Sequence, residues 1–363
     1  MSVLTSNILV PHGREEAWRF TPLNRLKGLH DGSATIAAHH SLSLESASVP
    51  GVTFERISRE LLPSLSATDD AIMNRVREAS SDVAVLKIAA NTEVTEPIQL
   101  NRKSFDLSAA EFSRVLIHVG ANARAIVIAS NTGNTLLAED IEFKVESGAS
   151  LTFVTLQEWD SQTVHVAKHH AIVDKDAFFK SITVTIGGSV VRLLPTVEFT
   201  GPGADAQLLG VYFATSGQFF EHRIFVDHCV PQAKSRVNYK GALSGDKAHT
   251  VWIGDVFIRA NAEGTDTYEL NRNLLLTDGA RADSVPNLEI ETGEIVGAGH
   301  ASTTGRFDDE QLFYLMSRGI SIEDARRLVV RGFFSEIINE VADANAQERL
   351  MNRIDSELIK VGA

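Results

Sequence analysis

One histidine, His300, lies in a stretch of residue types that can support chemistry. The stretch "AGHASTTG", Ala298 to Gly305, sets the imidazole among glycines and small hydroxylated residues, and the glycines allow a tight backbone. A neutral imidazole can also ligate a transition metal near pH 7. Spacing alone favours a structural or capping histidine, with a metal ligand as the alternative.

A second group of histidines occurs in "VHVAKHHAIV". Residue alternation in a strand places His165 and His169 on the same face. A two-histidine metal site fits this spacing, but the carboxylate or third histidine that it needs is not local. The sequence favours a solvated or partner-facing strand over a metal site formed by His165, His169 and His170.

Two further candidates for nucleophilic chemistry are weak. His228 and Cys229 are adjacent in a predicted strand and point to opposite faces, so they do not form a base and thiolate couple. We expect a core cysteine and a histidine at the sheet surface. Ser302 lies near His300, but the G-x-S-x-G elbow and an acid that would orient the base are lacking.

The elements that position these residues fall into three regions. Residues 1–81 show helical spacing with loops, residues 82–299 alternate with a period of two, and residues 300–363 are helical again. The alternation is clear at Ile141 and Phe143 in "IEFKVESGA". The sequence predicts an all-β body between two helical regions, and its many short strands suit a sandwich, a barrel or a β-helix.

Turns in the β body recur as Gly-Ala pairs at Gly120, Gly148, Gly203 and Gly279. The first two gaps, 28 and 55 residues, are close to one and two copies of a common unit. The third gap, 76 residues, does not fit this unit.

The composition excludes several classes of function. A net charge of -13 argues against a nucleic-acid partner, because phosphate binding needs clustered Lys and Arg. With Cys229 as the single cysteine, one chain forms no disulfide and no four-cysteine cluster site. Neither a membrane span nor a signal peptide is indicated, so we expect a cytoplasmic protein. Neither G-x-G-x-x-G after a strand nor a P-loop motif occurs, so a partner would bind any nucleotide.

The C-terminal region carries helix start and stop signals. Asp308 can cap a first helix with Gln311, and Gly319 can close it. Ser321 with Asp324 forms a capping-box pattern for the next helix.

Four segments closely resemble the SufB/SufD family of iron-sulfur cluster assembly proteins. "NRNLLLTDGARADSVPNLEI" and "GHASTTGRFDDEQLFYLMSRGIS" resemble its C-terminal signature, "DHCVPQAKSRVNYKGAL" its mid-body segment, and "EEAWRFTPL" the opening of its SufD branch. Ala301 stands where SufB-type chains carry a glutamate after the histidine, which also favours the SufD branch. Many SufD-type chains carry a cysteine where this chain has Ala298, so no thiol role is expected there.

The resemblance implies a right-handed parallel β-helix core, residues 82–299, flanked by a helical N-terminal region, 1–81, and a helical C-terminal region, 300–363. It also implies a scaffold that is no enzyme by itself. Such a scaffold pairs with SufB through the β-helix, while the ATPase SufC docks on the helical ends. We expect no cofactor bound stably by the chain alone, although an iron-sulfur cluster held transiently with SufB fits this picture. No flavin motif is visible.

The resemblance assigns His300 as a ligand for iron or a nascent cluster near the SufB interface. It assigns the helices between Asp308 and Val341 to SufC. The candidates for SufC contact or its support are Phe313, Tyr314, Arg318, Phe333 and Phe334. An aromatic residue at helical spacing is nevertheless more often part of a core than of an interface.

Two other functions compete with the scaffold. One is a metal-dependent enzyme on the all-β body, using His300 or the group of His165, His169 and His170. The other is a homodimer of like chains, which would pair edge to edge where SufB would sit.

Overall fold

The computed structural model describes residues 8–38, 40–45, 49–62, 68–307 and 309–360. The chain is mainly β, with 49% strand and 16% helix. The helices are α1 (Ala71–Ala79), α2 (Asp309–Ser317), α3 (Ile322–Ile338) and α4 (Ala344–Lys360), with short 3-10 helices at Leu23–Arg25 and Arg59–Leu61. The strands are β1 (Leu42–Leu44), β2 (Val52–Ser58), β3 (Asp82–Ile88), β4 (Ile98–Ser104), β5 (Ala110–Val119), β6 (Arg124–Gly133), β7 (Leu136–Val145), β8 (Ser150–Trp159), β9 (Val164–Val173), β10 (Phe178–Thr185), β11 (Val190–Phe199), β12 (Asp205–Ala214), β13 (Phe219–His228), β14 (Lys234–Leu243), β15 (His249–Ile258), β16 (Thr265–Leu275), β17 (Arg281–Ile290) and β18 (Ile295–Arg306).

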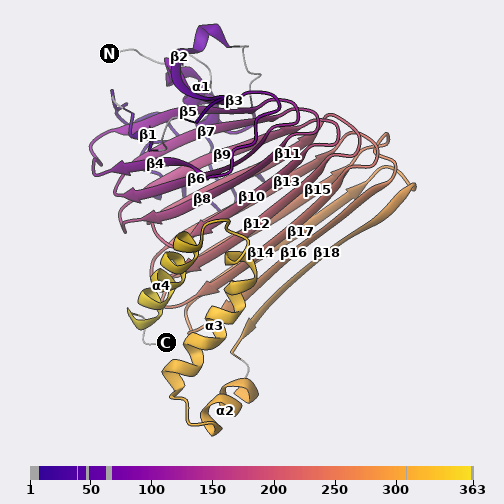
Figure 1. The fold of residues 1–363 in the computed structure, drawn as a ribbon. Coiled ribbons are helices and arrows are strands. Elements are labelled where there is room, and N and C mark those ends of the chain that lie inside the picture. The colour runs from indigo at the N-terminus through magenta and orange to yellow at the C-terminus, as the bar shows by residue number, and fades with distance from the viewer. Residues whose placement is uncertain (1–7, 39, 46–48, 63–67, 308, 361–363) are drawn as a thin grey trace.

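The strands form a parallel solenoid of about 8 turns (Figure 1). Successive strands alternate between two sheets, one with the order β1-β4-β6-β8-β10-β12-β14-β16-β18 and the other with the order β17-β15-β13-β11-β9-β7-β5-β3-β2. From β4 and β3 onward every pair within a sheet is parallel. The predicted parallel β-helix is therefore confirmed, and the sandwich and barrel alternatives are excluded.

Two columns of turns explain the irregular spacing of the Gly-Ala pairs. Gly148 and Gly203 have positive φ and follow odd-numbered strands, β7 and β11. Gly279 also has positive φ but follows the even-numbered strand β16, so it belongs to the other column. Val119 at the end of β5 is the register partner of Val145 at the end of β7. Gly120 therefore occupies the turn position of Glu146 and not that of Gly148. The prediction of one repeated unit was right for Gly148 and Gly203 only.

The hydrophobic core fills the space between the two sheets. Every strand of a solenoid points alternate side chains inward, and in β7 these include Leu137, Ile141, Phe143 and Val145. The same core continues through Val256 in β15. Successive turns stack these inward residues on one another, so the whole solenoid shares one core.

The outer face of the even-numbered sheet is covered by α3 and α4, as Figure 1 shows. Phe334 and Ile337 from α3 and Leu350 from α4 pack against strand residues such as Val184 and Phe213. Ser321 caps α3 by accepting a hydrogen bond from the backbone N–H of Asp324, as predicted. Gly319 closes α2 with φ +86, also as predicted. The proposed cap at Asp308 lies outside the described residues.

The outer face of the odd-numbered sheet is covered by the N-terminal region, which is less helical than expected. Only α1 is an α-helix there; the other regular elements of its described residues are β1, β2 and two short 3-10 helices. Trp18, from the "EEAWRFTPL" segment, is buried and lies 4.1 Å from the Arg192 guanidinium of β11. The segment is stabilised by this packing on the sheet, so it needs no helix of its own.

The parallel solenoid runs from β3 to β18, and the C-terminal helices follow it. β3 begins at Asp82, where the β body was expected to begin. β18 continues to Arg306, so the C-terminal helices begin at Asp309 and not at residue 300. Within the described ranges, no helix combines the length and apolar character needed to cross a membrane.

Candidate functional site

The last turn of the solenoid, β17 and β18, is an open end. Each of these strands has one neighbour in its sheet within the described chain, so its outer edge is unpaired. Apolar side chains are exposed there, with Val296 75% and Ile290 45% exposed. An unpaired strand edge next to exposed apolar residues is suited to pairing with another chain.

His300 lies on the inward face of β18. Its register partner in β16 is Glu269, and Ala298, two residues earlier on the same face of β18, packs against the solenoid core. The His300 side chain is nevertheless 43% exposed, because no further turn covers it. His300 lies within β18, which ends at Arg306, and a ligand role for it stays a prediction.

Glu269 is the residue at this end that the sequence reasoning missed. Its side chain is fully buried, and neither carboxylate oxygen has a hydrogen-bond partner among the described residues. Burial, together with the nearby Asp255 carboxylate, raises the pKa of Glu269 to about 8. The nearest base is His300, whose Nδ1 lies 3.7 Å from Oε1 of Glu269.

A polar network fills the interior beside Glu269. Asn271 donates to the hydroxyl of Tyr212 at 2.9 Å, and that hydroxyl donates to Oδ1 of Asn273 at 2.6 Å. Ser284 of β17 donates to Oδ1 of Asn271 at 2.8 Å. The signal for this polar interior is present in "ELNRN", where Glu269, Asn271 and Asn273 alternate at inward positions.

The other histidine group does not form a site. His165 and His169 lie on the same face of β9, as predicted, but that face is turned to the interior and both are buried; His170 lies on the opposite face, beside Thr196. His169 lies edge-on to Phe143, and burial lowers its pKa to about 4. Among the residues that the structure describes, no three His, Cys, Asp or Glu side chains are arranged to hold a metal ion. β9 is therefore not the solvated strand that the sequence favoured, and His165, His169 and His170 do not form a metal site.

For His228 and Cys229 the structure shows the reverse of the expected arrangement: the histidine lies in the core and the cysteine nearer the surface. His228 is fully buried in the solenoid and shares a hydrogen bond with Ser235, whereas the Cys229 thiol is only partly buried in the following turn. The physical reason is that β13 ends at His228, so the inward alternation includes the histidine and ends before the cysteine. Ser302 lies exposed on the same strand as His300, without a nucleophile elbow.

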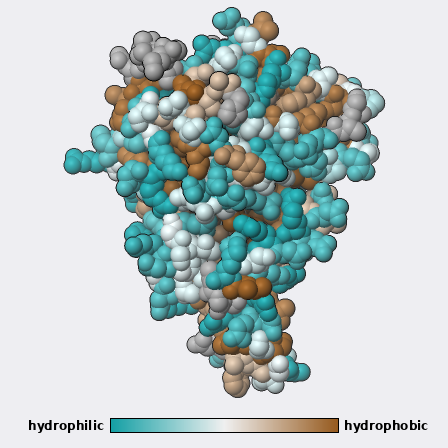
Figure 2. Space-filling model, turned by 90° about the vertical axis from the view of Figure 1, so that its left-hand side faces the viewer, coloured by the Kyte–Doolittle hydropathy of each residue, from teal (hydrophilic) through white to brown (hydrophobic). Residues whose placement is uncertain are grey.

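The candidates for ATPase contact fall into two groups. On α2, Phe313 is 73% and Tyr314 57% exposed; Arg318, which directly follows α2, is exposed with its guanidinium 5.1 Å from the Tyr314 ring. Figure 2 shows apolar surface at the lower tip of the molecule, where α2 lies. On α3, Phe334 is fully buried against the sheet and Phe333 is partly buried under Lys240. Phe334 can therefore support a contact but cannot make one.

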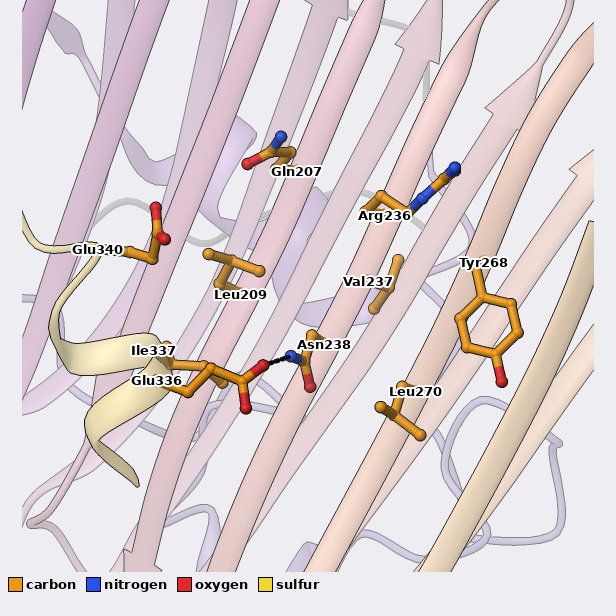
Figure 3. A pocket seen from close by; sticks show the side chains of 10 residues that line it. All are labelled: Gln207, Leu209, Arg236, Val237, Asn238, Tyr268, Leu270, Glu336, Ile337 and Glu340. Carbon is orange, nitrogen blue, oxygen red and sulfur yellow. Dashed lines mark hydrogen bonds between the residues drawn. The ribbon is translucent and has the colours of Figure 1, made fainter. Parts of the chain in front are cut away.

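A groove of about 310 Å³ lies between α3 and the outer face of β12, β14 and β16 (Figure 3). Leu209, Leu270 and Ile337 contribute apolar walls. Several of its polar groups are already engaged: Asn238 donates to Glu336 at 3.2 Å, and Arg236 donates to Asp266 at 2.7 Å. The groove offers apolar surface and few free polar groups.

Comparison with known proteins identifies related chains. Residues 101–333 match the family model described as "SUF system FeS cluster assembly, SufBD core domain". An iron-sulfur cluster assembly SufBD family protein of Mycobacterium leprae is 49% identical over 357 residues, covering 96% of this chain and 91% of the relative. Another SufBD family protein of the same organism is 29% identical over 214 residues, covering 59% of this chain and 24% of the relative. The SufD protein of Escherichia coli is 27% identical over 241 residues, covering 66% of this chain and 56% of the relative.

Proposed function

Because the chain belongs to the SufBD family of iron-sulfur cluster assembly proteins, we propose that it is a SufD-like, non-catalytic scaffold subunit of a SUF assembly complex. In this complex it pairs with a SufB-like chain and docks a SufC-like ATPase. The observation that carries the proposal is the open end of the solenoid, where the unpaired edges of β17 and β18 meet exposed apolar side chains.

A heteromeric pairing is supported by the comparisons. Mycobacterium leprae carries two SufBD family proteins, one 49% and one 29% identical to this chain. Two related chains in one organism suit a pair in which each solenoid covers the open end of the other. The resemblance of "EEAWRFTPL" to the SufD opening assigns this chain to the SufD side.

His300 would assist the cluster at this interface. It lies on the last turn, half-exposed, where a second chain would meet it. An imidazole is a ligand for iron, whereas Ala298 provides no thiol. The cluster itself would be cargo held transiently with the partner, and sulfur ligands would come from that partner.

The exposed face of α2 is the part that would dock the ATPase. Phe313, Tyr314 and Arg318 present two aromatic rings and a guanidinium, the residue types that dominate binding energy at interfaces. Phe334 would support α3 from below. The complex would work in the cytoplasm.

Reconstitution tests this function. The full chain is mixed with its SufB-like and SufC-like partners, and complex formation is followed by size-exclusion chromatography with mass determination. We expect a stable ternary complex; a chain that ignores both partners at micromolar concentrations contradicts the proposal. Cluster yield with His300→Ala, compared with wild type, tests the histidine: an unchanged yield returns it to a structural role.

The homodimer alternative uses the same open end. Solution mass with and without the SufB-like chain separates the two states, because a heterodimer predicts that the partner displaces like chains. A metal-dependent enzyme built on His165, His169 and His170 is not favoured, since His170 faces away from the other two.

A further inference from the structure

The carboxylate of Glu269 is a buried charge-bearing group that scaffold function alone leaves unexplained. It is fully buried, and both of its oxygens lack a hydrogen-bond partner among the described residues. A carboxyl group buried without a partner is unfavourable in either protonation state, because its polar atoms lose their hydrogen bonds to water. An apolar side chain would fill the same space more favourably, so the carboxyl group requires a reason.

A hydrogen bond to His300 does not supply that reason. The Nδ1 to Oε1 distance is 3.7 Å, beyond hydrogen-bond length. Elsewhere in this part of the solenoid a histidine and a carboxylate on neighbouring strands do close: Nε2 of His249 lies 2.7 Å from Oδ2 of Asp283. The Glu269 and His300 side chains are therefore close but not hydrogen-bonded.

The separation fits a shared metal ion. Metal bonds to imidazole nitrogen and carboxylate oxygen are about 2.0 to 2.2 Å long, so two ligands of one ion lie at most about 4.2 Å apart. The observed 3.7 Å is within this span and corresponds to a wide ligand–metal–ligand angle. The carboxylate has room to lie there because residue 254 is glycine: a Cβ on Gly254 would lie 2.2 Å from Oε2 of Glu269.

We infer that Glu269 and His300 form a two-ligand half-site for a divalent transition metal at the open end of the solenoid. One oxygen and one nitrogen donor suit ferrous iron, zinc or manganese better than soft ions. The inference deepens the proposed function and rests on it in one respect: in an assembly complex the ion is ferrous iron delivered as cargo, and the chain that covers the open end supplies the remaining ligands.

Cobalt(II) is the probe for this half-site, because its visible absorption reports coordination by protein ligands. The full-length chain is titrated anaerobically with Co²⁺, and the bound ion is counted by equilibrium dialysis. We expect one saturable site per chain. Glu269→Gln keeps the size of the side chain and removes the charge, and we expect it to weaken binding at least tenfold, as does His300→Ala.

Matched controls separate ligation from general charge. Glu294→Gln removes one negative charge from an exposed side chain in the turn between β17 and β18. His249→Ala removes a histidine already bonded to Asp283. Both should bind Co²⁺ like the wild type. If Glu269→Gln does not fold, Glu269→Met, an apolar side chain of similar length, takes its place, with thermal unfolding measured for each variant.

Three results would overturn the inference: no saturable Co²⁺ site in the wild type, a folded Glu269 variant that binds like the wild type, or an equal loss in Glu294→Gln. None of them bears on complex formation with the SufB-like and SufC-like chains. A chain that forms the complex but fails these titrations is a scaffold without the half-site. A chain that binds Co²⁺ through Glu269 but forms no complex keeps the half-site and loses the proposed function.

Discussion

Both ends of the solenoid bury a glutamate on the inward face of a strand, but the surroundings of the two glutamates differ. At the N-terminal end, Glu139 of β7 pairs with the buried Arg102 of β4, which also pairs with Glu111 at 3.2 Å. At the C-terminal end, Glu269 has no such cation. The first end pairs its buried carboxylates with a cation of the same chain, whereas the second leaves a buried carboxyl group without a partner among the described residues.

The strand edges at the two ends also differ, because only the N-terminal edges are covered by further strands. β1 and β2 add to β4 and β3 in antiparallel orientation and cover the first parallel strands. Ser41, just before β1, donates to Glu111 at 2.5 Å, so the cover also completes the polar cluster. β17 and β18 have no comparable cover in the described chain. A solenoid with one covered end and one open end is suited to bind a single partner chain, at the open end only.

The largest expected effect is a loss of stability at the N-terminal end of the solenoid, which we call the closed end because β1 and β2 cover it. Arg102→Met leaves Glu111 and Glu139 buried without their cation, and removing one partner of a buried charge network costs about 3 to 5 kcal/mol. Urea denaturation gives the free energy of unfolding. The control Arg306→Met breaks an exposed ion pair with Asp278, which we expect to cost less than about 1 kcal/mol.

Replacing the buried glutamate of the open end should leave the free energy of unfolding undiminished. Glu269→Met removes an unpartnered carboxylate, so we expect no loss in the same denaturation experiment. Equal destabilisation by Arg102→Met and Glu269→Met would mean that the two ends are alike after all.

The second effect is on pairing at the open end. Replacing Val296 and Ile290 by aspartate puts two charges where apolar side chains would be buried by a partner. We expect the affinity for the SufB-like chain to fall about 100-fold, equivalent to about 2.7 kcal/mol. Leu61→Asp is the matched control: Leu61 is also 75% exposed but lies next to β2 at the covered end. An equal loss in the control would remove the distinction between the ends.

Much of the fold was predictable from the sequence, and the reason is periodicity. The alternation of Ile141 and Phe143 in β7 reports directly which side chains face the core. The choice of β-helix over sandwich came from the family resemblance, because strand spacing does not encode which strands pair.

The candidate site was predictable only in part. His300 was found through its surroundings, but Glu269 was not, because a glutamate in an alternating strand is normally assigned to the solvent face. In β16 the polar residues Glu269 and Asn271 face inward and the apolar Leu270 faces outward, the reverse of the usual pattern, so the alternation alone points to the wrong face. The exposure of Phe313 and the burial of Phe334 were likewise not separable, since both are aromatic residues at helical spacing.

The smallest effect tests whether the interior between the two ends is dry. His169, buried beside Phe143 and Phe153, has its pKa lowered by burial to about 4, against 6.5 for an ordinary histidine. Between pH 6.5 and 4 the unfolded chain therefore binds a proton that the folded chain does not, and stability falls as the pH falls through this window. At pH 5 this group alone costs about 2 kcal/mol relative to pH 8.

His169→Leu removes this group, so the difference between the unfolding free energies at pH 8 and pH 5 should shrink by that amount. His12→Leu, at an exposed position, is the control for the loss of a histidine from the chain. If His169→Leu leaves the pH slope unchanged, water reaches the interior from the open end, and the imidazole can charge in place. Glu269 would then be hydrated too, and its lack of a protein partner would no longer distinguish the open end from the closed one.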